Sequence, residues 1–297
     1  MNAATQVTRS RLRHHEPLAR HTSWRVGGPA DVYFEPRDVA DLQAFLAELP
    51  AALPVLWLGL GSNLLMRDGG FRGAVVCIGR GFAGIEPLPD NQLRAGAGRP
   101  CAKLAQHCAR TGLAGGEFLA GVPGTVGGAL AMNAGAHGGE TWQRVQAVLT
   151  VDRQGRLHQR LPTDYRIGYR SVQGPAEECF LAADFAFSAA PPQQVQAAVH
   201  ALLRRRAATQ PLRQANAGSV FRNPEGDFAA RLIEAAGLKG LTRGKAQVSL
   251  LHANFIVNLG GARAADIETL IDEVQARVEA ASGIRLQPEV RRLGEPA

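Results

Sequence analysis

Apolar residues along the chain follow two different spacings, which predict a protein built of both helices and strands. The clearest helix is predicted over Ala264–Ser282, with Gly283 directly after it, because apolar residues recur there every three or four positions. That apolar stripe consists of Ile267, Leu270, Ile271, Val274 and Val278. The same spacing predicts four further helices: one capped by Asp38 that carries Val39, Leu42, Phe45, Leu46 and Leu49, one over Cys101–Thr111 closed by Gly112, one over Pro192–Arg206, and a short one between Asp227 and Gly237.

Short apolar runs predict the strands, and Arg153-Gln154-Gly155 predicts a hairpin turn between two of them. The first twenty residues are expected to form a loose arm. The predicted strands are Asp31–Glu35, Val55–Leu58, Ala74–Ile78, Val145–Val151, Leu157–Leu161, Phe180–Phe187 and Asn254–Asn258, with a final extended segment over Leu286–Arg292. Because this order lacks a regular strand–helix–strand rhythm, the fold class that we expect is α+β.

The length of the chain favours more than one domain. It has 297 residues, of which 45% are hydrophobic and 20% charged, as expected of a globular protein. At about 150 residues per domain, the starting expectation is two domains. The composition changes near residue 207, and Ala207–Ala217, with few large apolar residues, is expected to cross from one domain to the next.

The charge and cysteine patterns narrow the classes of function. The net charge is +7, but the basic residues are scattered except for the run Arg204–Arg206, so the surplus suits phosphorylated small molecules better than nucleic acid. The eight histidines lack the spacing of a metal site, and none is expected. No segment resembles a secretory signal or a membrane span, so we expect a soluble cytoplasmic protein. Four cysteines without a C-x-x-C pair are expected to be buried thiols: Cys77, Cys101, Cys108 and Cys179.

The first glycine-rich segment, GLGSNLL at 59–65, directly follows a predicted strand. Its opening glycines are similar to a dinucleotide-binding fingerprint, but Leu64 stands where the third glycine is needed, and Asp68-Gly69-Gly70 interrupts the helix pattern. A Rossmann site is therefore not expected. A tight turn with exposed backbone N–H groups remains, with Ser62 and Asn63 as side-chain donors, and such a turn is able to hold a phosphate.

The second segment, GVPGTVGGALAMNAGAHGGE at 121–140, contains seven glycines. Glycines at this density let a backbone approach a bulky ligand closely. Thr125 is expected to cap a short helix over Val126–Asn133, whose N-terminus favours a pyrophosphate. The phosphate-binding pattern Gly-Lys-Ser/Thr is absent. His137 is expected to be part of the loop structure.

At these segments the sequence resembles the UDP-N-acetylenolpyruvoylglucosamine reductases, which belong to the vanillyl-alcohol-oxidase-like flavoprotein superfamily. The resemblance runs from about His21 to Gly294, and its motifs occur in the family's order. They are HTSWRVGGPAD at 21–31, the two glycine-rich segments, IGYRS at 167–171, GSVFRNP at 218–224, LIEAAGLKG at 232–240, VSLLHANFIVN at 248–258 and LQPEVRRLG at 286–294. The resemblance implies a vanillyl-alcohol-oxidase-like FAD-binding fold with an additional C-terminal substrate-binding domain.

The resemblance also assigns roles to residues. The catalytic arginine falls on Arg170, the serine proton donor on Ser219 and the catalytic glutamate on Glu289, whereas Tyr169 and Asn223 fall on substrate-binding positions. The implied domains are two FAD-binding subdomains, 1–80 and 81–206, and a substrate-binding domain, 207–297. The implied FAD-binding residues are Gly59, Leu60, Gly61, Ser62, Asn63, Leu64, Gly121, Val122, Pro123, Gly124, Thr125, Gly127, Gly128, Ala129, Asn133, Ala134 and Gly135.

The chain resembles the shorter subtype of the family, because there is no room for an inserted tyrosine-bearing loop between Arg170 and the strand that begins at Phe180. The segment Thr242–Ala246 departs from the family pattern, with Lys245 where a second glycine is expected. The implied partners are a UDP-sugar and NADPH, and the chain is expected to be a monomer.

The chemistry of the implied substrate is consistent with these residue types. Hydride addition to an enolpyruvyl group drives negative charge into its carboxylate, and that charge must be stabilised where it develops. Arg170 supplies a permanent cation with paired donors, Glu289 a hydrogen-bonding group, and Ser219 a proton for the α-carbon. Because side chains do not carry hydride, the flavin that the resemblance implies does that work.

Two alternatives stay open from the sequence. One is a flavin oxidase of the same superfamily that acts on an alcohol or a sugar, which predicts rapid reoxidation of reduced FAD by oxygen. The other is a nucleotide-sugar-binding regulator without turnover, which predicts a colourless protein.

Overall fold

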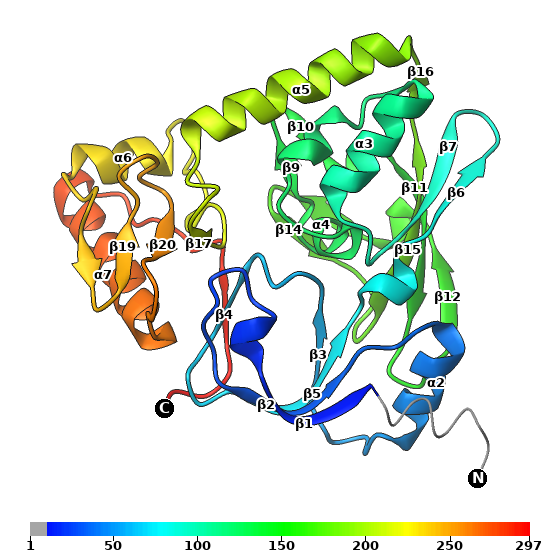
Figure 1. The fold of residues 1–297 in the computed structure, drawn as a ribbon, viewed down its shortest axis with the longest axis horizontal. Helices are drawn as coiled ribbons and strands as arrows, with labels where there is room; N and C mark the ends of the chain where they lie inside the picture. Colours follow the sequence, from blue (N-terminus) through cyan, green and yellow to red (C-terminus); the bar gives the residue numbers. More distant parts are fainter. Residues whose placement is uncertain (1–10) are drawn as a thin grey trace. The chain divides into compact units, whose positions relative to one another are not determined.

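A computed structural model describes residues 11–297, and the described chain falls into two compact units (Figure 1). Unit 1 contains the described residues 11–13, 32–60 and 73–205. Unit 2 contains 14–31, 61–72 and 206–297. Both units mix helices with strands, and the predicted α+β class is confirmed.

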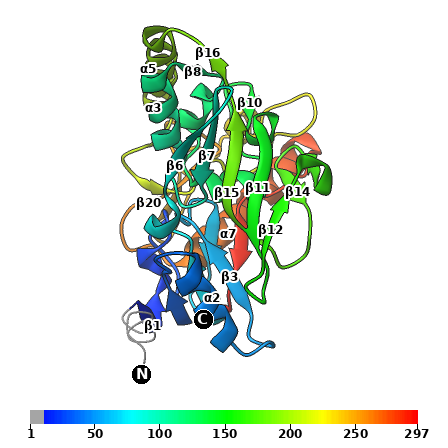
Figure 2. The ribbon, with the colours of Figure 1, turned by 90° about the vertical axis from the view of Figure 1, so that its right-hand side faces the viewer.

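An antiparallel sheet of five strands forms the frame of unit 1, and Figure 2 shows these strands side by side. The strand order is β12-β11-β15-β7-β6. The predicted hairpin is confirmed, since β11 and β12 pair with Val151 opposite Leu157. The pattern of apolar residues does not predict β6 and β7, because β6 is short, half-exposed and interrupted by Pro87. The bounds are β6 Ile85–Leu88, β7 Gln92–Gly96, β11 Val145–Val151, β12 Leu157–Arg160 and β15 Cys179–Ala186.

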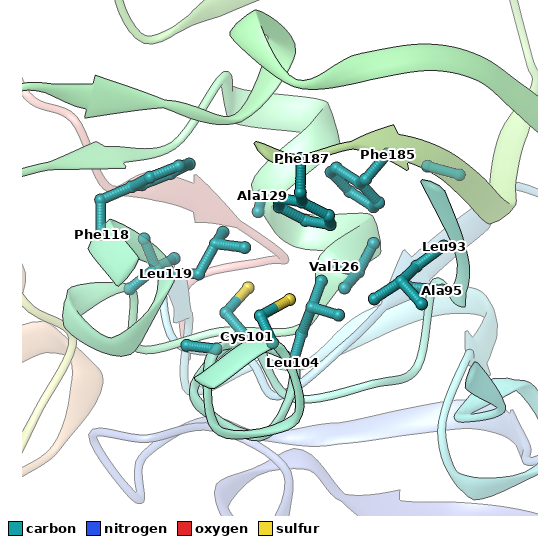
Figure 3. Packing of buried hydrophobic residues seen from close by; sticks show 14 of the residues in the cluster. Leu93, Ala95, Cys101, Leu104, Phe118, Leu119, Val126, Ala129, Phe185 and Phe187 are labelled. Carbon is teal, nitrogen blue, oxygen red and sulfur yellow. The ribbon is translucent and has the colours of Figure 1, made fainter. Parts of the chain in front are cut away.

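Helices α3 (Cys101–Thr111) and α4 (Val126–Met132) pack their apolar faces into one core with this sheet. Figure 3 shows Cys101 and Leu104 of α3 and Val126 and Ala129 of α4 gathered with the rings of Phe185 and Phe187. The predicted end of α3 is confirmed, because Gly112 lies in the left-handed region with a φ of 72°. This core fixes α4, which carries the second glycine-rich segment.

A second core in unit 1 lies around α2 (Val39–Glu48) and β3 (Val55–Leu58). The predicted cap of α2 is confirmed, since Asp38 accepts a 2.8 Å hydrogen bond from the Asp41 N–H. β3 pairs in parallel with β5 (Phe71–Cys77) at 74–77. These strands belong to a sheet with the order β1-β2-β5-β3, and the unit boundaries fall inside β1 (Leu12–Pro17), β2 (Pro29–Phe34) and β5.

Shorter elements complete unit 1. The β13–β14 hairpin is the one that matters for the site, because it places Tyr169 and Arg170 at its turn. The bounds are η2 Arg80–Phe82, β8 Leu113–Ala114, η3 Glu117–Gly121, β9 Gly135–Ala136, β10 Gly139–Glu140, η4 Thr141–Gln143, η5 Pro162–Asp164, β13 Arg166–Gly168, β14 Ser171–Gln173, β16 Ser188–Ala189 and α5 Pro192–Thr209, of which the last residues belong to unit 2.

Unit 2 is organised around α7 (Ala264–Ser282), whose predicted apolar stripe is buried. The sheet β17-β20-β19-β18 and helix α6 pack with α7 around one core that includes the fully buried Trp24. Asp68 caps α7 from another segment, accepting 2.9 Å hydrogen bonds from the N–H groups of Ala264 and Ala265. The bounds are η1 Leu18–Arg20, β4 Leu64–Met66, β17 Ala215–Asn216, α6 Ala229–Ala235, β18 Thr242–Arg243, β19 Ala246–Val248, β20 Ile256–Asn258 and β21 Arg291–Leu293.

Several predicted boundaries are wrong. The first twenty residues are not a loose arm throughout, because 12–17 form β1 and Leu18 is buried; residues 1–10 lie outside the described part. Helix α5 continues to Thr209 instead of ending at Arg206. The strand expected from Asn254 begins only at Ile256, because the Asn254 carbonyl accepts from the Val220 N–H and the Phe255 N–H closes a turn onto the His252 carbonyl. In the described residues 11–297, no helix is long and apolar enough to cross a membrane.

Candidate functional site

The two glycine-rich segments meet at Gly59, directly after β3. A Cβ atom added at Gly59 would lie only 2.6 Å from the Thr125 Oγ1. The same hydroxyl accepts a 3.4 Å hydrogen bond from the Gly128 N–H and so caps α4. Gly59 and Thr125 approach this closely because glycine has no side chain. The structure therefore brings together one residue from each predicted cofactor segment.

The first N–H groups of α4 are bound by the protein itself. Val126 donates to the Arg99 carbonyl and Gly127 to the Ala97 carbonyl, both at 2.8 Å. The N–H groups of Val126 and Gly127 are therefore not free to bind a pyrophosphate. The Gly128 N–H is also bound, since it donates to the Thr125 Oγ1, but Gly128 leaves open space beside its backbone: an added Cβ would meet only that oxygen, at 3.7 Å.

In unit 2, the first glycine-rich segment continues against the motif that begins at His21. Gly61 lies in the left-handed region with a φ of 59°, and a Cβ there would lie 2.2 Å from the His21 carbonyl oxygen. The Gly61 carbonyl accepts a 3.2 Å hydrogen bond from the Ser23 N–H. Both its conformation and its crowding require glycine at position 61. The motif that begins at His21 thus contacts the loop at Gly61 and restricts its conformation.

Asn63 links the loop to the terminal glutamate motif within unit 2. Its side-chain Nδ2 donates to the Glu289 carbonyl at 3.1 Å, and its own carbonyl accepts from the Arg291 N–H at 3.0 Å. From there β4 and β21 run in parallel, with Leu64 opposite Arg291. A predicted cofactor residue and the segment of a predicted catalytic residue are therefore held together.

Arg170 stands at the turn of the β13–β14 hairpin in unit 1 with a φ of 52°, a left-handed conformation that is uncommon for arginine. Its Nη2 donates to the Gly135 carbonyl at 2.8 Å, and its guanidinium carbon lies 5.2 Å from the centre of the Tyr169 ring. Strain of this kind is retained where surrounding contacts determine it, often at functional sites. Arg170 is thus held at the end of the second glycine-rich segment, and Tyr169 is half-exposed beside it.

Asn133 ends α4 in a left-handed conformation and is 2% exposed. Its side chain donates to Glu140 at 2.9 Å and to the Gly168 carbonyl at 3.1 Å, and accepts from the Trp142 N–H at 3.1 Å. These bonds brace the hairpin that carries Arg170. The Asn133 side chain is therefore engaged within the protein, although the residue belongs to a predicted cofactor segment.

Other predicted cofactor residues bury their side chains in the protein. Val122, Ala129 and Leu64 are buried, so the groups that they offer to a ligand belong to the backbone. Gly121 packs against Ala136 and His137, where an added Cβ would lie 3.0 Å from the Ala136 Cβ.

Ser219 and Glu289 lie in two segments of unit 2 that pair through their backbones. The Glu289 N–H donates to the Val220 carbonyl at 2.8 Å, and the Arg222 N–H donates to the Gln287 carbonyl at 2.9 Å. Phe221 and Pro288 form an isolated antiparallel bridge. The structure thus brings the serine motif and the glutamate motif side by side, although they are about seventy residues apart in sequence.

Asn223 is exposed and holds the turn before α6, since its Oδ1 accepts a 3.1 Å hydrogen bond from the Ala229 N–H.

Asn254, in contrast, has no predicted role. Its signal in the sequence is an amide side chain between the apolar residues Ala253 and Phe255.

Two family profiles and several relatives match the chain. Residues 30–159 match the FAD binding domain, and residues 210–293 match the C-terminal domain of UDP-N-acetylenolpyruvoylglucosamine reductase. The UDP-N-acetylenolpyruvoylglucosamine reductase of Alkalilimnicola ehrlichii is 55% identical over 295 residues, 99% of each chain. That of Methylococcus capsulatus is 57% identical over 281 residues, 95% of this chain and 92% of the relative.

A solved structure agrees with the sequence relatives. The crystal structure of UDP-N-acetylenolpyruvylglucosamine reductase from Thermus caldophilus superposes with a TM-score of 0.82 at 33% identity, over 95% of this chain and 98% of that one. Identity above one half over nearly the full length, joined with that structural match, leaves one conclusion: this chain belongs to the UDP-N-acetylenolpyruvoylglucosamine reductase family.

Proposed function

We propose that this protein reduces the enolpyruvyl group of UDP-N-acetylglucosamine enolpyruvate to give UDP-N-acetylmuramate, with FAD as cofactor and NADPH as reductant, in peptidoglycan synthesis. The observation that carries the proposal is the identity of 55–57% to reductases of this name over nearly the whole chain. The match of residues 30–159 to an FAD binding domain supports the cofactor.

The residues of the two glycine-rich segments fit FAD. Gly59 lies against Thr125 at a distance that excludes a side chain, and Gly128 leaves open space where a Cβ would stand. The open space at Gly128 suits a ligand that lies on bare backbone, whereas the close approach at Gly59 lets the two segments meet. We assign FAD binding to the glycine-rich loops at 59–64 and 121–135. When bound, FAD supplies hydride transfer, which no side chain performs.

Five residues serve the substrate in this proposal. Reduction adds a hydride to the β-carbon and a proton to the α-carbon, so the C=C double bond becomes a C–C single bond and two C–H bonds form. Arg170 binds the carboxylate and stabilises the charge that develops there. Ser219 gives the proton to the α-carbon, and Glu289 hydrogen-bonds the reacting group. Tyr169 and Asn223 bind the substrate.

The proposed parts of the chain follow from these roles. We assign 1–80 and 81–206 to the FAD-binding subdomains and 207–297 to substrate binding, which agrees with the reductase profile at 210–293. We propose a monomer that works in the cytoplasm. The four free thiols suit such a reducing compartment.

Anaerobic absorbance spectroscopy of the purified protein tests the proposal. We expect a yellow protein whose flavin absorbance is bleached by NADPH and restored by the enolpyruvyl substrate, with UDP-N-acetylmuramate as the product by mass spectrometry. Rapid reoxidation by oxygen without response to the substrate indicates the oxidase instead. A colourless protein that binds the UDP-sugar and does not take up added FAD indicates a regulator.

A further inference from the structure

Asn254 is a buried residue of unit 2 whose side-chain amide bonds the backbone N–H and carbonyl of one residue, Phe221. Asn254 is 4% exposed, and its Oδ1 accepts from the Phe221 N–H at 2.9 Å while its Nδ2 donates to the Phe221 carbonyl at 2.8 Å. The Asn254 backbone carbonyl also accepts from the Val220 N–H, at 2.9 Å. Three hydrogen bonds therefore hold three successive peptides, from 219–220 to 221–222.

These bonds replace a missing strand partner. Residues 220–222 pair with 287–289 on one side, through Val220 and Arg222. The Phe221 peptide groups are the ones that Asn254 satisfies. Buried peptide groups without partners are costly, so the Asn254 amide favours the one backbone position in which all of these groups are bonded.

The segment that Asn254 holds begins directly after Ser219. On the other side of Ser219, Gly218 is left-handed with a φ of 75°, and its N–H donates to the Asn216 Oδ1 at 2.9 Å. Ser219 is therefore fixed between two braced peptides. A hydroxyl that must reach one carbon of a bound substrate needs such a backbone, because small displacements of a reacting group are costly.

We infer that Asn254 is a positioning residue for the proton-donating hydroxyl of Ser219. This inference rests on the proposed role of Ser219. Asn254 acts through the Val220 and Phe221 peptides and does not touch the substrate. Its effect belongs to the step in which the α-carbon is protonated, and not to the reduction of the flavin by NADPH.

The test compares two matched substitutions, Asn254→Asp and Asn258→Asp. Each replaces an amide that donates to a backbone carbonyl, since the Asn258 Nδ2 donates to the Trp24 carbonyl at 2.9 Å. A carboxylate at either position faces a carbonyl oxygen, so both variants lose stability. We expect only Asn254→Asp to slow flavin reoxidation by the enolpyruvyl substrate, by about tenfold or more, with flavin reduction by NADPH within about twofold of wild type.

A double variant separates this inference from the proposed function. If Asn254 acts through Ser219, Asn254→Asp adds less than about threefold to the slowing already caused by Ser219→Ala. Full additivity, or equal slowing of both half-reactions, overturns the inference. If Ser219→Ala itself reoxidises at the wild-type rate, the proposed proton donor is wrong. If flavin reoxidation is slow in Ser219→Ala but has the wild-type rate in Asn254→Asp, only the positioning role of Asn254 is wrong.

Asn254→Ser provides a second route if Asn254→Asp does not fold. It leaves the pocket uncharged, and hydrogen exchange of a peptide covering 215–225 reports the brace directly. We expect faster exchange there than in wild type, together with the same selective slowing of reoxidation. Unchanged exchange in 215–225 would show that Asn254 does not hold the segment.

Discussion

Gly128 is the residue whose substitution best distinguishes an effect on FAD binding from an effect on protein packing. An added Cβ there has open space apart from the Thr125 Oγ1 at 3.7 Å, so Gly128→Val is expected to fold. The new side chain occupies the space that FAD needs, and we expect FAD binding to weaken by at least about tenfold, or 1.4 kcal/mol. Flavin absorbance per protein and titration with free FAD measure this.

The matched control is Gly84→Val, because an added Cβ at Gly84 meets no atom within 4 Å and Gly84 lies in unit 1 outside both segments. It is expected to keep its full FAD content. Equal flavin content in the two variants would remove Gly128 from the cofactor site.

Asn133 combines a left-handed backbone with three side-chain hydrogen bonds, and two substitutions resolve the two contributions. Asn133→Gly removes only the hydrogen bonds, which we expect to cost about 2–3 kcal/mol in the free energy of unfolding. Asn133→Ala adds the penalty of a left-handed alanine, about 1–2 kcal/mol. Urea unfolding measures both. A more stable alanine variant would contradict the backbone assignment.

Sequence motifs assign candidate roles to residues, but they do not predict the contacts of those residues. The resemblance selects Asn63 and Glu289, but no pattern indicates that the Asn63 amide binds the Glu289 carbonyl. Asn254 belongs to a quoted motif, yet its role depends on a peptide 33 residues away. Such contacts are set by tertiary packing, which local spacing does not encode.

Among the elements, the β11–β12 hairpin carries a pH dependence at its turn. Burial alone would raise the pKa of the Asp152 carboxyl, but hydrogen bonds from His158, Arg156 and Gln154 outweigh it and hold the pKa well below its ordinary value. A carboxyl with a depressed pKa in the folded state contributes stability that is present above its unfolded pKa, about 4, and is lost as the pH falls further.

Asp152→Asn is therefore expected to be less stable than wild type at pH 7, with a difference that shrinks as the pH falls below about 4. Thermal unfolding of both proteins from pH 7 to pH 3 measures this. A difference that stays constant over that range would show that the charge on Asp152 does not stabilise the hairpin.

Elements with a strong apolar period are predicted well and short ones are not. The stripe of α7 follows from its spacing, and the hairpin of β11 and β12 follows from two apolar runs that flank a turn sequence. The strands β17 and β18 have two residues each and owe their existence to pairing with neighbours. Two residues are too few to show an apolar periodicity, so the sequence pattern does not predict these strands.

At the scale of the whole molecule, the rate at which the four thiols react with a reagent measures how often the fold opens. Burial raises the pKa of Cys101 to about 12, and burial with the nearby Glu117 raises that of Cys108 to about 12, so the reactive thiolate is scarce at pH 8. We expect an aromatic disulfide reagent to label native protein slowly, with the half-buried Cys77 first, and all four cysteines at once in guanidinium. Rapid labelling of Cys101 in the native protein would contradict its burial.

The parallel pairing of β4 with β21 has a consequence for how the chain is made. Leu64–Met66 are paired with Arg291–Leu293, so more than two hundred residues must be added after β4 before its partner exists. At the ribosome's pace of about 5–20 residues per second, that wait is on the order of ten to fifty seconds. Throughout it, one edge of β4 stays unpaired and open to other nascent chains. A message that stops just before codon 291 would therefore leave β4, near residue 65, without its strand partner.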